Sequence, residues 1–387
     1  MGLAGNNAST ARRLTTLVIV ILLISFWITV TASVYPFGMR TDFVGFYLGF
    51  RMAWDGHYRD MYDLGTQARY QSLILPEEKE PPVYPRPPFL AAAFAPLALL
   101  PLRTAFVIWV AVGFVLLAGC SAWAWRRFGD DALIWGALSF PAFTGIAFGQ
   151  DSSLMLAIAV AGYSLAERGR DFAAGAVWGL ALIKFNLLLP LPLAMLAARR
   201  WRMLGGFSAT GGLLASWSVV AVGIDGLRLY ARLLENTNLT RLHSGPRYMM
   251  NLESIAANFP LRGDWFPILG AAAALAIGLL ALRHAPLWRW TSAAWMASLL
   301  VAPHVYVYNG AILLLPTWLA IFQSTSRWTR IAAAAFGFPI PYFLRLLNDK
   351  WAVVTPVVVL LFLVALAAES FSRVAVWTRG CEAPAGG

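Results

Sequence analysis

The chain has 387 residues, of which 59% are hydrophobic and only 13% are charged. A soluble domain usually has about 45–50% apolar and about 25% charged residues, so this composition excludes an ordinary soluble protein and indicates one that crosses a membrane several times. A net charge of +11 would suggest nucleic-acid binding in a soluble protein, but arginines also gather at the cytoplasmic ends of membrane helices. Because no soluble basic domain is present, we expect no nucleic-acid partner.

The first apolar run covers residues 14–34 and follows Arg12 and Arg13. A cleaved signal peptide is one interpretation of such a run. The run is long, however, and no clear cleavage site with small residues precedes Tyr35. We therefore expect a retained first membrane helix.

The next apolar runs are bounded by arginine clusters or turn residues, and they cover residues 88–101, 104–125, 132–148, 152–166, 172–185, 186–198, 203–223, 265–282, 291–303, 307–322, 331–347 and 351–371. The run 88–101 decides the topology, because it is short and contains Pro96, whereas a full span needs about 20 residues. If it crossed the membrane, Arg126 and Arg127 would lie on the opposite side from Arg12, against the positive-inside rule. We therefore expect a short helix at the outer face.

The sequence thus predicts an all-α polytopic membrane protein with about 12 transmembrane helices and both termini in the cytoplasm. Residues 1–387 are expected to form one domain. Its first external loop (35–103) would carry interfacial helices, a second external segment would cover 224–264, and 372–387 would be a cytoplasmic tail. The two cysteines, Cys120 and Cys381, cannot form a metal cluster or a disulfide framework.

The first external loop begins with TDFVGFYLGFRMAWDGHYRDMYD, residues 41–63. Its apolar residues recur at helical spacing, which predicts an amphipathic helix parallel to the membrane surface. The members of this stripe are Phe43, Phe46, Tyr47, Phe50 and Trp54. Asp42 leads the helix and could cap it, act as a general base that takes a proton from an incoming hydroxyl, or do both.

Two cations are candidates for binding phosphate. Arg86 lies in VYPRPPFL, residues 83–90, where it could reach lipid headgroups or clamp a lipid-linked phosphate through its planar donors. Lys184 ends the run 172–185. A charge inside a span costs about 2.5–3.5 kcal/mol on insertion scales and therefore suggests function, although Lys184 could also simply reach the outer surface.

Three further motifs fall on the same face. FGQDSS (148–153) contains Gln150 and Asp151, and Asp151 could instead cap the next helix. PHVYVYNG (303–310) contains His304, which could bind phosphate, carry a proton or be structural. YMMNLESIAANF (248–259) adds a weak signal from Asn251, Glu253 and Ser254. Because the topology was chosen from arginine positions alone, this convergence favours chemistry on a lipid-phosphate substrate at the outer face.

In this order, the motifs resemble glycosyltransferase family 87, polyprenol-phosphate-mannose-dependent α-mannosyltransferases of the glycosyltransferase C superfamily. The matching segments are TDFVGFYLGFRMAWDGHYRDMYD, YPRPPFLAAAFAPLALLP, FGQDSSLMLAIA, AAGAVWGLALIKFNLLLPLPL, NLES and APHVYVYNGAILLLP. The chain departs from the family pattern at Arg86, where an aromatic is frequent, at Asp151, where Asn is frequent, and at Asn309, where Asp is usual. These departures affect the prediction of which sugar and which acceptor are used more than the prediction of the reaction class.

The resemblance implies a glycosyltransferase C fold and a role for Asp42. Asp42 occupies the position of the catalytic acid. Arg86, Lys184 and His304 are expected to bind the donor phosphate. The expected substrate-binding residues are Tyr84, Gln150, Asp151, Asn251, Glu253 and Asn309.

The expected reaction moves a sugar, mannose by family default, from a polyprenyl-phosphate donor to a hydroxyl of a glycan or glycolipid. It would take place at the periplasmic face of a bacterial inner membrane. A phosphate leaving group needs no protonation, so one carboxylate base is enough and the anomeric centre would invert. We predict no cofactor and no metal, although Asp42 and Asp151 could share a divalent cation.

Two other classes of protein remain as alternatives. A multi-spanning transporter or flippase would have similar spans, but the sequence shows neither an internal repeat nor many charges at mid-membrane, as transporters usually do. A non-catalytic membrane scaffold is the second alternative. Observing sugar transfer from a lipid-linked donor would separate these classes.

Overall fold

The computed structural model describes residues 2–38, 42–76, 83–239, 245–259 and 285–380, and a few residues between 270 and 278. In these ranges the chain forms α-helices and short 3-10 helices and no strand. Among the described residues, the helical stretches long and apolar enough to cross a membrane are Thr10–Ser33, Leu102–Phe128, Trp201–Glu235 and Asp349–Phe371. The all-helical fold and its membrane character are therefore confirmed, while the count of twelve spans stays a prediction.

The helices of the first half are α1 (Gly2–Gly38), α2 (Asp42–Trp54), α3 (Leu64–Ile74), α4 (Pro88–Phe94), η1 (Ala95–Leu99), α5 (Leu102–Phe128), α6 (Asp131–Leu138), α7 (Phe140–Ala147) and α8 (Ser152–Glu167). Those of the second half are α9 (Asp171–Gly179), η2 (Leu180–Leu187), α10 (Pro190–Ala197), α11 (Trp201–Leu239), η3 (Pro246–Tyr248), α12 (Leu252–Asn258), α14 (Leu287–Val301), η4 (Val307–Leu313), α15 (Leu314–Gln323), α16 (Arg327–Gly337), α17 (Ile340–Leu347), η5 (Asp349–Val353) and α18 (Val354–Gly380).

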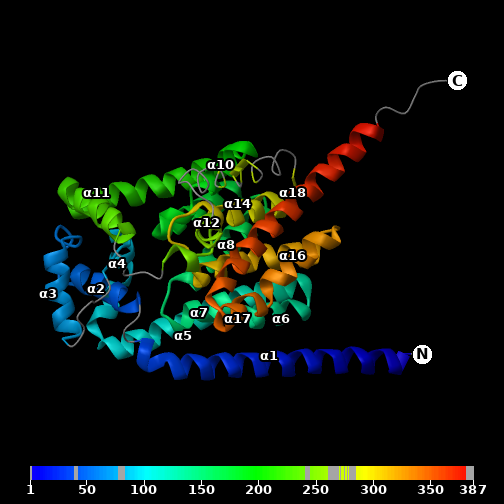
Figure 1. The fold of residues 1–387 in the computed structure, drawn as a ribbon, viewed down its shortest axis with the longest axis horizontal. Coiled ribbons are helices and arrows are strands. Elements are labelled where there is room, and N and C mark those ends of the chain that lie inside the picture. The colour runs from blue at the N-terminus through cyan, green and yellow to red at the C-terminus, as the bar shows by residue number, and fades with distance from the viewer. Residues whose placement is uncertain are drawn as a thin grey trace.

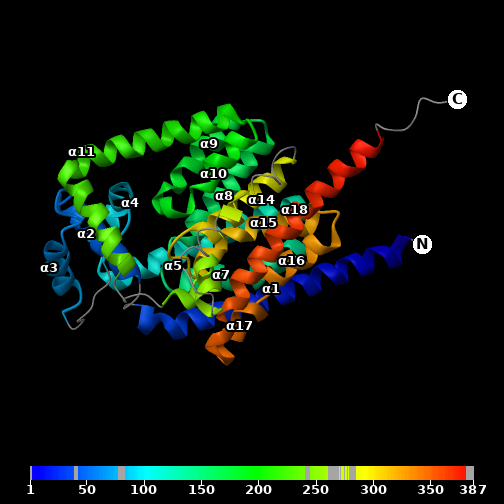
Figure 2. The same cartoon turned by 45° about the horizontal axis from the view of Figure 1, so that its top comes forward.

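The molecule has two distinct ends. Helices α2, α3 and α4 gather at one end, beside the bend of α11, whereas α1 begins and α18 ends at the other (Figure 1; Figure 2). The bend of α11 falls at Gly223, whose φ of 72° lies in the left-handed region that glycine adopts without strain. Helices α2, α3 and α4 therefore lie at the opposite end of the molecule from the start of α1.

Several predicted runs are divided in the structure. The run 132–148 splits into α6 and α7 at Ser139, just before Pro141 in the first turn of α7, because proline fits only the first turn of a helix. The runs 172–198 become α9, the 3-10 helix η2 and the eight-residue α10. Most of the predicted span 265–282 and all of Cys381 lie outside the described residues, and Cys120 is buried.

Helix α2 differs from the expected surface helix. Ten of its residues are buried, including Val44, Leu48 and Met52, which lie off the predicted stripe. The rings of Phe46 and Phe50 pack against Trp109 of α5 with centroids 6.1 and 5.8 Å apart. The apolar stripe predicted protein contacts on one face of α2 only, but protein also covers other faces of this helix. Helix α2 is therefore a packed core element, and it holds Asp42 firmly.

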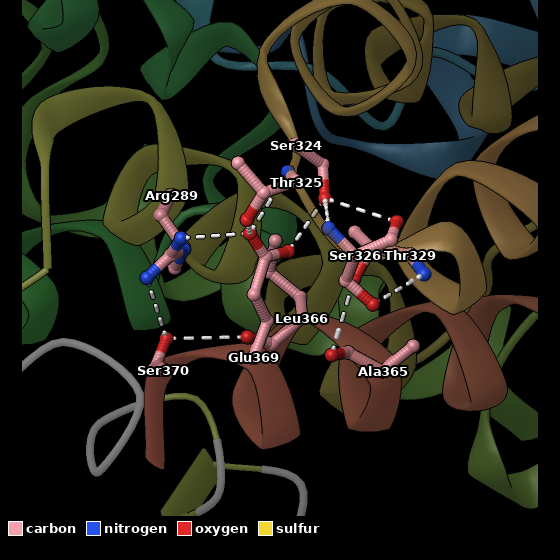
Figure 3. A network of polar contacts seen from close by, with 9 residues as sticks. All are labelled: Arg289, Ser324, Thr325, Ser326, Thr329, Ala365, Leu366, Glu369 and Ser370. Atoms are coloured by element: carbon pink, nitrogen blue, oxygen red, sulfur yellow. Dashed lines mark hydrogen bonds and ion pairs between the residues drawn. The ribbon is translucent and has the colours of Figure 1, made fainter. Parts of the chain in front are cut away.

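A buried polar network joins three helices far from α2 (Figure 3). Arg289 of α14 donates to Glu369 of α18 at 3.0 Å, and both side chains are 3% exposed. Glu369 also accepts bonds from the Ser324 hydroxyl at 2.6 Å and from the Thr325 amide at 3.2 Å, in the turn between α15 and α16. A buried charge needs such partners, so this network fixes α14 and α18 to that turn.

Candidate active site

Asp151 lies between two cations in the interior. Arg86 Nε is 3.1 Å from Asp151 Oδ2, and Lys184 Nζ forms an ion pair with Asp151 Oδ1. The side chain of Asp151 is fully buried, and those of Arg86 and Lys184 are 16% and 4% exposed. Burial on its own would raise the pKa of Asp151, but the charges of Arg86 and Lys184 outweigh it and hold that pKa below its ordinary value.

The turn before α8 places Asp151. Gly149 has a φ of 64°, and a Cβ there would lie 2.7 Å from the Cβ of Phe43 and 2.9 Å from the ring of Phe106. Only glycine fits this conformation and this space. The turn thereby brings Gln150 and Asp151 against α2 and α5.

A break in helical geometry places Lys184. Its φ and ψ of −126° and 61° are non-helical, so η2 does not continue α9 as a regular helix. The ammonium lies over the ring of Tyr308 in η4, with Nζ 5.5 Å from the centroid, within the range of a cation–π contact. Lys184 is thus held between Asp151 and an aromatic face.

Asp42 joins this cluster through Gln150. The side-chain amide of Gln150 donates a hydrogen bond to Asp42 Oδ2. Asp42 is exposed in the first turn of α2, whereas Gln150 is buried. The charge of Asp42 also acts on both Arg86 and Lys184. The structure therefore brings together five predicted site residues, namely Asp42, Arg86, Gln150, Asp151 and Lys184. Of the two carboxylates among them, that of Asp42 is accessible.

The loop that carries Arg86 is held by tyrosines. The Tyr62 hydroxyl donates to the Arg86 carbonyl at 2.8 Å, and the Tyr84 hydroxyl donates to the Pro87 carbonyl at 2.8 Å. Tyr84 is fully buried, so its hydroxyl supports the loop and does not face an open substrate site. The Arg86 guanidinium lies 5.4 Å from the centroid of Phe46, which orients its planar fork.

The loop that carries His304 is tied from two sides. The Asn186 amide, two residues after Lys184, donates to the Pro303 carbonyl at 3.2 Å, and the Asn251 amide donates to the Ala302 carbonyl at 2.9 Å. His304 has a φ of 54°, a conformation that costs a side chain some strain. The loop leads directly into η4, which carries Tyr308.

The remaining predicted residues lie around this loop. Asn251 is buried and caps α12, accepting from the Ser254 amide at 3.1 Å, so its side chain serves the backbone. Glu253 is exposed in the first turn of α12. Asn309 is buried in η4, and its Oδ1 has no hydrogen-bond partner among the described residues.

Both oxygens of Asp151 face cationic groups, so this carboxylate is not placed to share a metal ion with Asp42. The described part of the chain also brings no three His, Cys, Asp or Glu side chains together in a way that could hold a metal ion.

Comparison with known families decides the class. The model of glycosyltransferase family 87 matches residues 84–316, which is more than half of the chain. The chain belongs to glycosyltransferase family 87. It is therefore a membrane glycosyltransferase with a sugar donor and an acceptor. The matched region contains Arg86, Asp151, Lys184 and His304, while Asp42 precedes it. Neither the curated proteins nor the solved structures contain a match.

Sequence reasoning missed the aromatic side chains that support this cluster. Tyr308 lies under Lys184, Phe46 lies under Arg86, and Tyr62 stacks on Tyr230 with centroids 4.4 Å apart beside the Arg86 loop. Only the alternation of aromatics in VYVYNG could have hinted at Tyr308. Phe46 and Tyr230 lie in α2 and α11, and Tyr62 lies in the turn before α3; the fold brings all three to the Arg86 loop.

Proposed function

We propose that this glycosyltransferase moves a sugar, with mannose as the expected one, from a polyprenyl-phosphate donor to an acceptor hydroxyl, using Asp42 as the general base. The observation that carries the proposal is the contact of Asp42 with Gln150, which directly precedes the Asp151 that holds Arg86 and Lys184. An accessible base beside a pair of buried cations is the arrangement that transfer from a phosphate ester requires.

The cations keep donors for a phosphate. Asp151 engages Arg86 only through Nε and Lys184 through one bond, whereas a guanidinium has five N–H donors and an ammonium has three. Arg86, Lys184 and Asp151 together carry one net positive charge, and Asp42 becomes neutral when it takes the proton of the acceptor. That charge would stabilise the phosphate as the bond to the sugar breaks, and His304 would approach the same group from its loop.

The reaction balances with a single base. The acceptor hydroxyl gives its proton to the Asp42 carboxylate, and its oxygen forms a bond to the anomeric carbon from the face opposite the phosphate. The bond from that carbon to the phosphate oxygen breaks, and polyprenyl phosphate leaves with the electron pair. One displacement inverts the anomeric configuration.

The membrane setting supports a lipid-linked donor. A small cavity of about 30 Å³ is lined by Gln150 and Asp151 on one side and by Phe94, Trp109 and Val112 among its apolar walls. Val112 is an exposed residue of the candidate span α5, so a prenyl chain could approach from lipid. The positive-inside rule would put this end at the periplasmic face of a bacterial inner membrane, in a glycosyltransferase C fold of about twelve spans.

Purified protein in lipid nanodiscs would be incubated with polyprenyl-phosphate mannose and a panel of glycan and glycolipid acceptors. We expect transfer and release of polyprenyl phosphate, and a product of inverted configuration by NMR. Asp42→Asn should abolish transfer while the protein keeps its thermal stability. Asp60→Asn is the matched control, because this carboxylate is in the same segment and its side chain is 61% exposed.

Transfer near the wild-type rate in Asp42→Asn would exclude Asp42 as the base. Movement of the donor across the bilayer without cleavage of the phosphate bond would exclude the proposed use of this donor. Activity with a nucleotide sugar and none with polyprenyl-phosphate sugars would also contradict it.

A further inference from the structure

A second polar cleft lies away from the candidate active site, between the C-terminal turns of α5 and α8. It has a volume of about 770 Å³. Its lining combines small and apolar side chains with charged ones, namely Gly119, Ala122, Trp123, Arg126, Arg127, Ser164, Glu167 and Arg168. The established reaction has no use for these residues.

The cleft has an excess of positive charge. Arg127 pairs with Glu167 at 2.5 Å, so these two charges cancel. The guanidinium groups of Arg126 and Arg168 form no hydrogen bond or ion pair with the part of the chain that the structure describes. Cations near helix C-termini suit the helix dipole, which explains their position along the helices. The helix dipole does not explain why two guanidinium groups without a protein partner among the described residues line a cleft.

The depth of the cleft fits a lipid headgroup. Helix α8 begins directly after Asp151 and ends at Glu167, which at 1.5 Å per residue separates the cleft from the active site by about 24 Å. The hydrocarbon core of a bilayer is about 30 Å thick. Helix α5 is a candidate span that runs the same way, from Leu102 to Phe128. The cleft therefore lies near the headgroups of the leaflet opposite Asp42.

The floor of the cleft fits a lipid chain. Gly119 and Ala122 precede Arg126 by one to two turns of α5, which puts them about 6–10 Å closer to the membrane centre. Gly119 is exposed, and a Cβ added there meets no atom within 4 Å. The site thus has charged donors at its rim and an open apolar path below them.

We propose that this cleft binds one anionic phospholipid of the leaflet opposite the active site. Arg126 and Arg168 hold its phosphate, since arginine pairs with phosphate through two parallel hydrogen bonds and basic pockets between membrane helices bind anionic headgroups. One acyl chain lies over Gly119 and Ala122. The proposal depends neither on the donor of the glycosyl transfer nor on which leaflet is periplasmic.

The test measures lipid retention by native mass spectrometry of the purified full-length protein. The protein would be equilibrated in mixed micelles with equal amounts of phosphatidylglycerol and phosphatidylcholine. We expect one tightly retained phosphatidylglycerol in the wild type. In the double variant Arg126→Gln with Arg168→Gln the retention should be weaker by a factor of at least about ten, since hydrogen bonds to charged groups contribute about 1.5–3 kcal/mol. Gly119→Leu should fill the path and weaken retention without loss of thermal stability.

Matched variants separate the cleft from general surface charge. Arg202→Gln with Arg330→Gln removes two exposed arginines elsewhere, and Gly212→Leu changes an exposed glycine of α11 that also has open space around it. Both should keep the lipid. Equal loss of lipid in the Arg202 and Arg330 double variant, or unchanged retention in both cleft variants, would overturn the proposal. Displacement of the lipid by inorganic phosphate at equal concentration would overturn it in favour of a free anion site.

Discussion

The side-chain amide of Gln150 donates a hydrogen bond to the carboxylate of Asp42, which lies 108 positions earlier in the chain. This bond connects the first turn of α2 to the turn before α8. Because Gln150 is buried and Asp42 is exposed, the bond orients the carboxylate from its protein side and leaves its other side open. Gln150 is therefore placed to position the proposed base.

Replacing Gln150 by Leu should lower kcat and leave the KM for the donor nearly unchanged. The reason is that Arg86 and Lys184 keep their contacts with Asp151, while Asp42 loses the donor that orients it. A misplaced catalytic group costs roughly 100-fold in rate. Steady-state kinetics with variable donor would measure both constants. A higher donor KM with unchanged kcat would mean that Gln150 binds the donor directly and does not position Asp42.

Removing the charge of Asp151 should destabilise the protein. Asp151→Asn leaves Arg86 and Lys184 buried without their counter-ion, and breaking a buried pair from one side costs about 3–5 kcal/mol. The pKa of this carboxyl is held below its ordinary value, so the stabilisation is present above about pH 4 and is lost as the pH falls through the lowered pKa. Thermal unfolding followed by size-exclusion fluorescence would detect the change.

The double variant Asp151→Asn with Lys184→Met separates stability from activity at this pair. It should recover most of the lost stability, because one uncompensated charge is removed. It should stay inactive, because the lysine ammonium that would bind the donor phosphate is absent. Recovery of activity together with stability would show that Lys184 has no role with the donor.

Arg86→Lys should keep the charge and lose the geometry. A lysine ammonium cannot contact Asp151 and a phosphate with a planar fork, so a hydrogen bond to a charged group is lost, at about 1.5–3 kcal/mol. The value of kcat/KM for the donor should fall roughly 10–100-fold. Arg69→Lys is a control in the same segment between α1 and α5, where the guanidinium donates a hydrogen bond to the Thr66 hydroxyl. Equal effects of both changes would contradict a specific role for Arg86.

The sequence predicted the membrane class and the helical fold because composition and apolar runs report them directly. It did not predict where short helices end. Ser139 divides one run because Pro141 lies in the first turn of the next helix. Lys184 leaves helical geometry in another run, and that break depends on what the helices pack against. The stripe of α2 identified Phe46 and Phe50 as apolar contacts, but Val44 and Leu48 are buried as well because α2 meets protein on several sides.

The sequence also identified the charged members of the site but not their pairing. Asp151 appeared as a substrate ligand or a helix cap, and it proves to hold Arg86 and Lys184 together. Tyr84 and Asn251 lie in the right motifs, yet their polar atoms bond the backbone of neighbouring loops. Motif spacing gives residues that come near one another, whereas the direction of each side chain depends on long-range packing.

The Arg289–Glu369 pair should contribute to stability and not to catalysis. Either Arg289→Met or Glu369→Gln alone leaves a buried charge without its partner and should cost about 3–5 kcal/mol. The apolar double variant Arg289→Met with Glu369→Leu should be much closer to the wild type. Thermal unfolding of the wild type, the single variants and the double variant gives the coupling free energy of the pair. The activity per folded molecule should be equal in all variants. A lower activity per folded molecule would mean that this network reaches the active site.

Gly49→Ala should disturb the Arg86 loop through Tyr84. A Cβ at position 49 would lie 2.4 Å from the Tyr84 ring, and this ring is fully buried with its hydroxyl bonded to the Pro87 carbonyl, so it cannot move aside without shifting the loop. Overpacking of this kind costs about 1–3 kcal/mol. Thermal unfolding and donor kinetics would show lower stability and a higher donor KM. Gly212→Ala, where a Cβ meets nothing within 4 Å, should change neither. If Gly49→Ala kept the wild-type donor KM, contact between Tyr84 and α2 would not set the position of Arg86.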